Sequence, residues 1–205
     1  SEEKIKGSSL YVTLEPCSKQ GRTPACTEEI IKNSIKEVII GSSDPSQDGL
    51  KVLSNAGIKT QIGVLKDKTD DHHKGFLSRV ERKRPYVRCK IACSLDGGVA
   101  FLNGESKWIT SEKSRIDSHD LRKKSDAIIT GIGTVIADDP KMTVRSKEVK
   151  KQPIVCVLDT KLKSKGTEKI YQRGSESFIF TKTNHKTINN KNIKIVEIDS
   201  KEGVI

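Results

Sequence analysis

Two cysteines near the N-terminus are the first residues whose type and spacing suggest a chemistry. Cys17 follows an apolar run at residues 10–14, and Cys26 lies just before Glu28 and Glu29, which suit the positive end of a helix. A strand end followed by a helix start can place two thiolates on one side of a metal, and zinc takes four ligands in a tetrahedron. The spacing alone leaves open both a zinc site and two cysteines without a metal.

A second pattern with possible chemistry is Gly131-Ile132-Gly133-Thr134, which stands between a predicted strand at 126–130 and a helix that begins near Val135. Small residues at such a junction let an anion approach backbone amides at a helix N-terminus. The same glycines would equally serve a turn with unusual backbone angles. Asp159-Thr160 ends another predicted strand, at a position where α/β sheets bind ligands.

Strands and helices must alternate to position these residues, and the hydrophobic pattern predicts that they do. The predicted strands are 10–14, 38–40, 58–64, 86–92, 126–130, 153–158, 177–181 and 193–198. The predicted helices begin near Thr27 and Leu50, cover 67–84, run from a Thr110-Ser111 cap to about Lys124, and begin again near Val135. This alternation is typical of an α/β fold with a largely parallel sheet.

A basic helix and linker at residues 67–84 divides the chain into two domains, 1–84 and 85–205. In the helix, Phe76, Leu77 and Val80 form an apolar side, and the basic residues occupy the other side. The sequence therefore predicts two small α/β domains joined by this segment.

The composition limits the class of protein. The 205 residues are 33% hydrophobic and 32% charged, without an apolar run long enough to span a membrane and without a signal peptide at the start. An odd count of five cysteines then favours a reducing, cytoplasmic environment. The net charge of +11 raises the question of nucleic acid, but the basic residues alternate with acidic ones and aromatic residues make up only 4%. Lysines on solvated faces explain the charge better than a nucleic-acid partner.

Several motifs occur together in an order typical of one family. They are Thr13-Leu14-Glu15-Pro16-Cys17-Ser18, Gly21-Arg22-Thr23-Pro24 before Cys26, residues 90–97, Ser106-Lys107-Trp108-Ile109-Thr110, Leu121-Arg122, residues 131–135, and Asp138-Asp139-Pro140 ahead of Thr143-Val144-Arg145. Across residues 10 to about 159 the chain resembles the bifunctional deaminase/reductase of the riboflavin pathway. The resemblance implies part of a cytidine-deaminase-like layer in residues 1–84, followed by part of a dihydrofolate-reductase-like domain in residues 85–205.

The resemblance also implies an activity and a set of site residues. The family deaminates a phosphoribosylamino-pyrimidine with zinc-bound water and then uses NADPH to reduce 5-amino-6-(5-phosphoribosylamino)uracil to its ribitylamino form. Cys17 and Cys26 would be zinc ligands, and Lys90 would stabilise charge that develops on the sugar. Residues at the NADPH site would be Ala92, Trp108, Thr134, Asp138 and Thr160. Residues on the substrate would be Ser106, Arg122, Met142 and Arg145, with the two arginines on its phosphate.

The chain departs from the family at two places. No His-x-Glu segment precedes Cys17, so the third zinc ligand and the proton-transferring Glu are missing, and the Gly-Gly segment that the family places after a later strand is missing too. We therefore expect a fragment truncated at both ends, with an inactive deaminase half. The family suggests a homodimer. The alternatives are a nucleic-acid-acting zinc deaminase or basic RNA-binding module, and a folded remnant that binds neither zinc nor NADPH.

Overall fold

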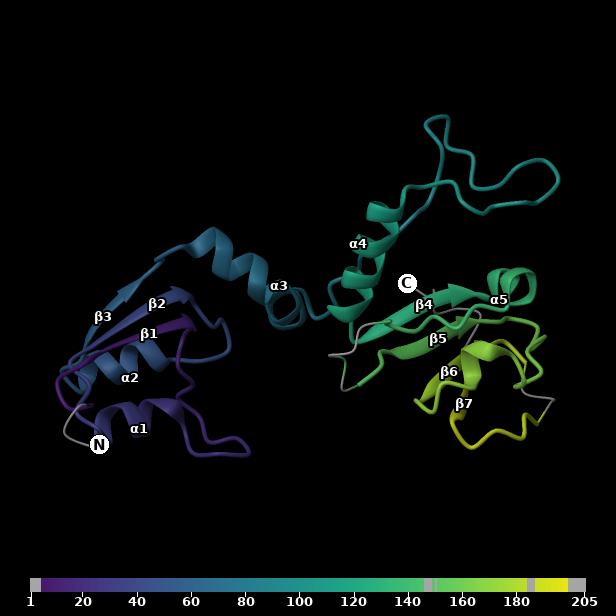
Figure 1. The fold of residues 1–205 in the computed structure, drawn as a ribbon. Helices are drawn as coiled ribbons and strands as arrows, with labels where there is room; N and C mark the ends of the chain where they lie inside the picture. The colour runs from purple at the N-terminus through teal and green to yellow at the C-terminus, as the bar shows by residue number, and fades with distance from the viewer. Residues whose placement is uncertain (1–4, 146–148, 150, 184–186, 199–205) are drawn as a thin grey trace. The chain divides into compact units, whose positions relative to one another are not determined.

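The chain folds into two units, residues 1–89 and 90–205, each built around its own parallel sheet (Figure 1). The structure is a computed structural model that describes residues 5–145, 149, 151–183 and 187–198. The α/β prediction is confirmed, because every paired strand in the described part of the chain runs parallel to its neighbour.

The first unit holds the strands β1 (Ser9–Leu14), β2 (Glu37–Ser42) and β3 (Lys59–Ile62), with β2 between the other two. The helices α1 (Cys26–Lys32) and α2 (Gly49–Asn55) connect these strands and cover one face of the sheet (Figure 1). This is the order that the alternation predicted, because two parallel neighbours need a crossover connection that returns the chain to the end of the sheet where the first strand began.

The core of the first unit explains why these segments fold together. Val38 and Ile40 are fully buried on one face of β2 and pack with Ile30 of α1 and Leu53 of α2. Gly41 faces the opposite side of the strand, where a Cβ atom would come within 2.4 Å of the Thr69 side chain. The helix α3 (Lys66–Arg82) therefore lies against this second face, and a glycine allows its close approach.

The second unit is a four-stranded parallel sheet, ordered along the chain. Its strands are β4 (Ala127–Gly131), β5 (Ile154–Leu158), β6 (Ser177–Thr181) and β7 (Ile193–Glu197). Val155, Val157 and Ile179 point to one face and form a core with Val135 of the helix α5 (Ile132–Asp138). A 3-10 turn, η2 (Lys169–Tyr171), closes this core from the loop before β6.

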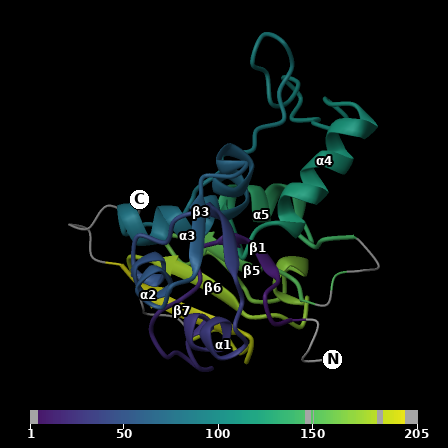
Figure 2. The same ribbon diagram turned by 90° about the vertical axis from the view of Figure 1, so that its left-hand side faces the viewer.

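The helix α4 (Glu112–Lys123) precedes the sheet and begins as the cap predicts. The Ser111 hydroxyl accepts a hydrogen bond from the Ser114 amide, 3.3 Å away, which satisfies one of the free amides of the first turn. No residue of α4 is completely buried. The segment before it, residues 90–110, loops away from the strands of its own unit in both views (Figures 1 and 2).

The predicted strand at residues 86–92 is wrong. Those residues have no regular secondary structure and form no ladder, and Val87 and Ile91 are 65% and 66% exposed. Alternating apolar residues make a strand only when a neighbouring strand supplies hydrogen bonds and a face to cover. Among the described residues, no strand pairs with this segment.

Among the described residues, no helix is both long enough and apolar enough to cross a bilayer.

Candidate functional site

The structure brings Cys17 and Cys26 together at the end of β1. Cys26 is the first residue of α1, and its amide donates a hydrogen bond to Cys17 Sγ over 3.2 Å. The Thr27 amide donates to the Cys17 carbonyl over the same distance. The Cys17 side chain, through its hydrogen bond, raises the pKa of the Cys26 thiol, with burial adding to the shift. The two thiols are therefore neighbours, as a shared metal would require.

A buried carboxylate fixes the loop that carries Cys17. Glu15 is 6% exposed, and its two oxygens accept the amides of Asp44 and Leu50 at 3.1 and 2.8 Å. Gly49 packs so closely that a Cβ atom there would come within 1.9 Å of the Pro16 carbonyl oxygen. The loops after β1 and β2 therefore hold each other in place beside the cysteine pair.

The cysteine pair could supply at most two of the four ligands that a tetrahedral zinc ion needs. Among the described residues, no group of three or more His, Cys, Asp or Glu side chains is arranged to hold a metal. All five cysteines are free thiols. Two thiols fit half of a zinc site, so no water-activating step follows from these residues alone.

In the second unit, the strand register places two predicted cofactor contacts at one edge of the sheet. Gly131 pairs with Leu158, so the chain leaves β4 and β5 at the same level. Thr134 lies in the first turn of α5, directly after β4, and Thr160 lies two residues beyond β5. Both side chains are exposed, and a Cβ atom at Gly131 or Gly133 would meet nothing within 4 Å. This is the carboxyl edge, where open α/β sheets bind ligands.

The helix α5 begins earlier than its pattern indicated, at Ile132, so it includes Gly133. It ends at Asp138, whose carboxylate is exposed, and Asp139 follows in the left-handed region with a φ of 39°. Asp139 accepts the Lys169 amide over 2.8 Å and forms an ion pair with the Lys169 side chain. That contact ties the end of α5 to the η2 turn.

Asp159 has a structural role beside Thr160, which was predicted to contact NADPH. It is fully buried, and its carboxylate accepts the amides of Lys163 and Ser164 at 2.9 and 2.7 Å, together with the Ser164 hydroxyl. The Thr160 carbonyl in turn accepts the amide of Lys182, which follows β6. These bonds hold the carboxyl-edge loop in one conformation and leave the Thr160 side chain exposed.

The predicted phosphate contacts Arg122 and Arg145 lie close enough to affect one another. Burial lowers the pKa of the Arg122 guanidinium, and the positive charge of Arg145 lowers it further. Arg122 Nη1 donates to the Thr143 carbonyl over 3.4 Å, which links the last turn of α4 to the segment that carries Arg145. Met142, from the same segment, packs against the core of the unit.

The remaining predicted site residues lie on the segment before α4. Lys90 and Trp108 are exposed, and Ala92 and Ser106 are partly buried. Trp108 contacts Arg115 of α4, whose guanidinium carbon lies 4.4 Å from the centroid of a Trp108 ring. Within the described residues, no hydrogen bond joins Lys90, Ala92 or Ser106 to the sheet.

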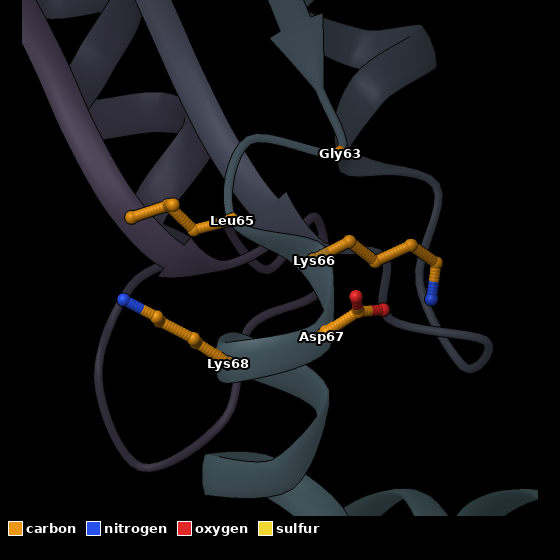
Figure 3. A pocket seen from close by; sticks show the side chains of 5 residues that line it. All are labelled: Gly63, Leu65, Lys66, Asp67 and Lys68. Carbon is orange, nitrogen blue, oxygen red and sulfur yellow. The ribbon is translucent and has the colours of Figure 1, made fainter.

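A pocket in the first unit has no share in these sites. It lies where β3 leads into α3 and is lined by Gly63, Leu65, Lys66, Asp67 and Lys68. Figure 3 shows the Lys66 and Lys68 side chains extending to opposite sides, and Leu65 is 65% exposed. None of the predicted site residues lines this open pocket.

The comparison with protein families decides the identity of the second unit. The family described as the RibD C-terminal domain matches residues 85–204, more than half of the chain. The chain belongs to this family. Membership agrees with the parallel α/β fold and with the riboflavin-pathway resemblance read from the sequence.

Individual relatives agree with the family match. The chain is 45% identical over 164 residues to the riboflavin biosynthesis protein RibD of Aquifex aeolicus, which covers 78% of this chain and 46% of that protein. It is 44% identical over 181 residues to RibD of Bacillus amyloliquefaciens, covering 86% of this chain and 49% of that protein. The chain spans about half the length of the curated relatives it matches.

The solved structures extend the likeness to both units. A diaminohydroxyphosphoribosylaminopyrimidine deaminase/5-amino-6-(5-phosphoribosylamino)uracil reductase from Thermotoga maritima is similar with a TM-score of 0.88 and 36% identity. The match covers 95% of this chain and 56% of that one. RibD of Acinetobacter baumannii is similar with a TM-score of 0.87 and 37% identity, covering 96% of this chain and 58% of that one.

Proposed function

We propose that the second unit carries out the NADPH-dependent reduction of 5-amino-6-(5-phosphoribosylamino)uracil to its ribitylamino form. Family membership makes this unit a RibD reductase domain. The observation that supports a nucleotide site is the register between β4 and β5, which gives Thr134 and Thr160 a common place at the carboxyl edge. The open backbone at Gly131 and Gly133 fits a ligand that approaches closely.

In this proposal Ala92, Trp108, Thr134, Asp138 and Thr160 hold NADPH, which supplies the hydride. The hydroxyl groups of Thr134 and Thr160 bind its polar groups at the carboxyl edge, and Trp108 offers an aromatic face for a flat ring. The protein must bring the nicotinamide carbon to about 3–3.5 Å from the sugar carbon. Because Ala92 and Trp108 lie on an exposed segment, that segment must close over the edge when the cofactor binds.

The substrate is held by Ser106, Arg122, Met142 and Arg145. The two arginines bind its phosphate, since a planar guanidinium donates two parallel hydrogen bonds to phosphate oxygens. Lys90 places a cation beside the sugar oxygen, where negative charge develops during hydride transfer. Ser106 and Met142 fix the sugar between these charged groups.

NADPH binding by the full chain tests the proposal, with nucleotide fluorescence recorded in the presence and absence of the aminouracil phosphate. We expect saturable binding that weakens about tenfold or more in Thr134→Ala and in Asp138→Ala, because each change removes a polar contact to the cofactor. Thr167→Ala, an exposed threonine outside the site, is the matched control. A folded chain without saturable NADPH binding would contradict the proposal.

For the first unit we propose that residues 1–84 are part of a zinc deaminase domain and that Cys17 and Cys26 are its two cysteine ligands. The hydrogen bond between Cys26 and Cys17 supports a shared ligand role, and the similar Thermotoga structure is of a protein named as a deaminase/reductase. The other ligands are not among the described residues, so no hydrolytic step is assigned to this chain.

Equilibrium dialysis against Zn²⁺ tests the cysteine proposal. We expect weak binding that disappears in Cys17→Ser and Cys26→Ser, because two thiolates hold zinc less tightly than a complete tetrahedral set. Cys156→Ser, in β5 of the other unit, is the matched control. Equal binding by the native chain and the Cys17→Ser chain would argue against this site.

The family match does not favour a nucleic-acid-acting deaminase or an RNA-binding module. For the oligomeric state we propose a homodimer, on the resemblance alone. Sedimentation equilibrium would give twice the chain mass, and the mass of a single chain at all concentrations would contradict it.

A further inference from the structure

A cluster of cations in the second unit extends beyond the two arginines of the proposed phosphate site. It consists of His119 and Arg122 of α4, Arg145, and Arg173 from the loop before β6. His119 and Arg173 did not stand out in the sequence, because neither belongs to a motif and 54 positions separate them. The fold brings both of them close enough to Arg122 for its charge to act on them.

Gln152 connects the members of this cluster. Its side-chain oxygen accepts the Val144 amide over 2.8 Å, and its side-chain nitrogen donates to the Val144 carbonyl over 3.1 Å. Arg173 Nη2 donates to the same Gln152 oxygen at 3.5 Å and to the Pro153 carbonyl at 3.1 Å. Arg122 bonds Thr143 on the other side of Val144, so the arginines surround one short stretch of backbone.

The arginines of the cluster have no carboxylate paired with them within the described residues. Among the described residues, no carboxylate forms an ion pair with Arg122, Arg145 or Arg173. Burial lowers the pKa of the Arg173 guanidinium, and the charge of Arg122 lowers it further. Cations that are partly withdrawn from water need a counter-charge, and the described residues pair none of these three arginines with a carboxylate.

Several buried polar atoms in the cluster have no partner within the described part of the chain. They are Nε and Nη1 of Arg173 and Nδ1 of His119. A guanidinium has five N–H donors, and the bonds of Arg173 to Gln152 and Pro153 use only Nη2. A purely structural arginine would direct its remaining donors to carbonyls or carboxylates, whereas Nε and Nη1 of Arg173 have no acceptor among the described residues.

We propose that Arg173 and His119 complete the anion site of Arg122 and Arg145, so that this site binds the phosphate of a phosphate monoester as a dianion. The inference rests on the proposed function, in which Arg122 and Arg145 bind the substrate phosphate. Arg173 adds a third guanidinium, and His119 takes up a proton when the anion binds. The three arginines then discriminate for the doubly charged phosphate and against the neutral sugar.

The electrostatics around His119 support proton uptake. Burial lowers the pKa of its imidazole first, and then Arg122 of its own helix and Arg145 of the neighbouring segment lower it further, while Asp120 opposes them. A dianion among the arginines offsets their charge, so binding raises the pKa of His119. By linkage, the anion binds more tightly as the pH falls through the histidine range.

Titration of the full chain with inorganic phosphate, followed by the ring NMR signals of His119, tests the role of Arg173. The signals are assigned with His119→Gln. We expect saturable shifts and an affinity that falls about tenfold or more in Arg173→Gln, since one charge-assisted contact is lost. Arg82→Gln in the other unit removes the same charge and should leave the affinity unchanged. Equal affinities in the native chain and Arg173→Gln would overturn the proposal.

Inorganic sulfate isolates the histidine, because sulfate stays a dianion between pH 5 and 8 while phosphate itself titrates. We expect sulfate to bind more tightly at pH 5.5 than at pH 8 in the native chain, and with less pH dependence in His119→Gln. If Arg173→Gln fails to fold, Arg173→Lys keeps the charge and removes the fork, and should still weaken phosphate binding. Ring NMR signals of His119 that do not shift when phosphate or sulfate is added to the native chain would overturn the proposal.

These titrations need neither NADPH nor turnover, so they separate the two proposals. Anion binding that depends on Arg173, in a chain that does not bind NADPH, would support the cation site and contradict the reductase assignment. NADPH binding and turnover, with a phosphate affinity unaffected by Arg173→Gln, would support the reductase assignment and contradict the role of Arg173 in the anion site.

Discussion

A buried chain of polar side chains organises the loop after β5. Tyr171 is 1% exposed, its hydroxyl lies 2.9 Å from Ser164 Oγ, and Ser164 Oγ donates to Asp159 over 2.8 Å. Burial raises the pKa of the Tyr171 phenol to about 12, against a partial lowering by its hydrogen bond with Ser164. The phenol is therefore kept neutral to high pH, and the carboxyl-edge loop depends on its staying so.

Replacement of Tyr171 by Phe should show this dependence. Its folded pKa of about 12 lies above the ordinary value of 10.0, so the native state holds the proton more tightly. The contribution of the protonated Tyr171 phenol to the free energy of unfolding is therefore complete below pH 10 and is lost as the pH rises towards 12. We expect Tyr171→Phe to cost about 1 kcal/mol at neutral pH through the lost hydrogen bond.

Urea unfolding at a series of pH values measures this effect. Between pH 10 and 12 the native chain should lose stability more steeply than Tyr171→Phe, and other titrating groups cancel in the comparison. Tyr11→Phe, at a tyrosine that is 73% exposed, is the control. Parallel pH curves for the native and Tyr171→Phe chains would contradict the prediction.

At the scale of elements, two glycines show how the helices are placed. Gly49 begins α2 against the Pro16 carbonyl, whereas Gly75 lies within α3 and would meet nothing within 4 Å if it carried a Cβ atom. The first glycine is required by a close approach that also fixes the Cys17 loop. The second only weakens its helix, because glycine is a poor helix former.

Alanine substitutions at these glycines should have opposite effects. We expect Gly49→Ala to destabilise the first unit by about 1–3 kcal/mol, since backbone must move to relieve the overlap. Gly75→Ala should stabilise it by about 0.5–1 kcal/mol. Chemical unfolding followed by circular dichroism measures both, and destabilisation by Gly75→Ala would show that α3 packs more tightly than we infer.

For the whole molecule, the main feature is that two parallel sheets with separate cores are joined through residues that belong to neither core. Residues 81–91 are exposed throughout, and Leu95 and Leu102 are fully exposed. The segment from residue 81 to residue 110 carries Lys90, Ala92, Ser106 and Trp108, so its conformation decides whether the proposed reductase site forms. Exposed backbone without ladder hydrogen bonds is also the first to be cut by proteases.

Limited trypsin digestion tests this organisation. We expect the first cuts after Arg88, Lys90 and Lys107, which leave fragments that contain β1–β3 and β4–β7. The bond after Arg84 should resist because Pro85 follows it. NADPH should slow the cut at Lys107 if Trp108 closes over the cofactor. First cuts within either sheet, identified by mass spectrometry, would contradict the prediction.

The sequence alone determined the alternation of elements and the motifs. Ser111 capped its helix as predicted, and the apolar runs at 154–158 and 177–181 became buried strands, because local periodicity and capping act over only a few residues. Cys17 and Cys26 could be paired because only a turn separates them. The assignment of Thr134, Asp138 and Thr160 to NADPH stays a prediction.

Only the tertiary structure decided the rest. The alternation at 86–92 predicted a strand that does not form, since a strand depends on a distant partner that a local pattern cannot supply. Long-range packing likewise brought Arg173 to Arg122 and brought Arg145 to His119 and Arg122 of α4, and the register of β4 with β5 set Thr134 and Thr160 at one edge. Burial and neighbouring charge belong to the folded chain, so the electrostatics of these sites could be read only from the fold.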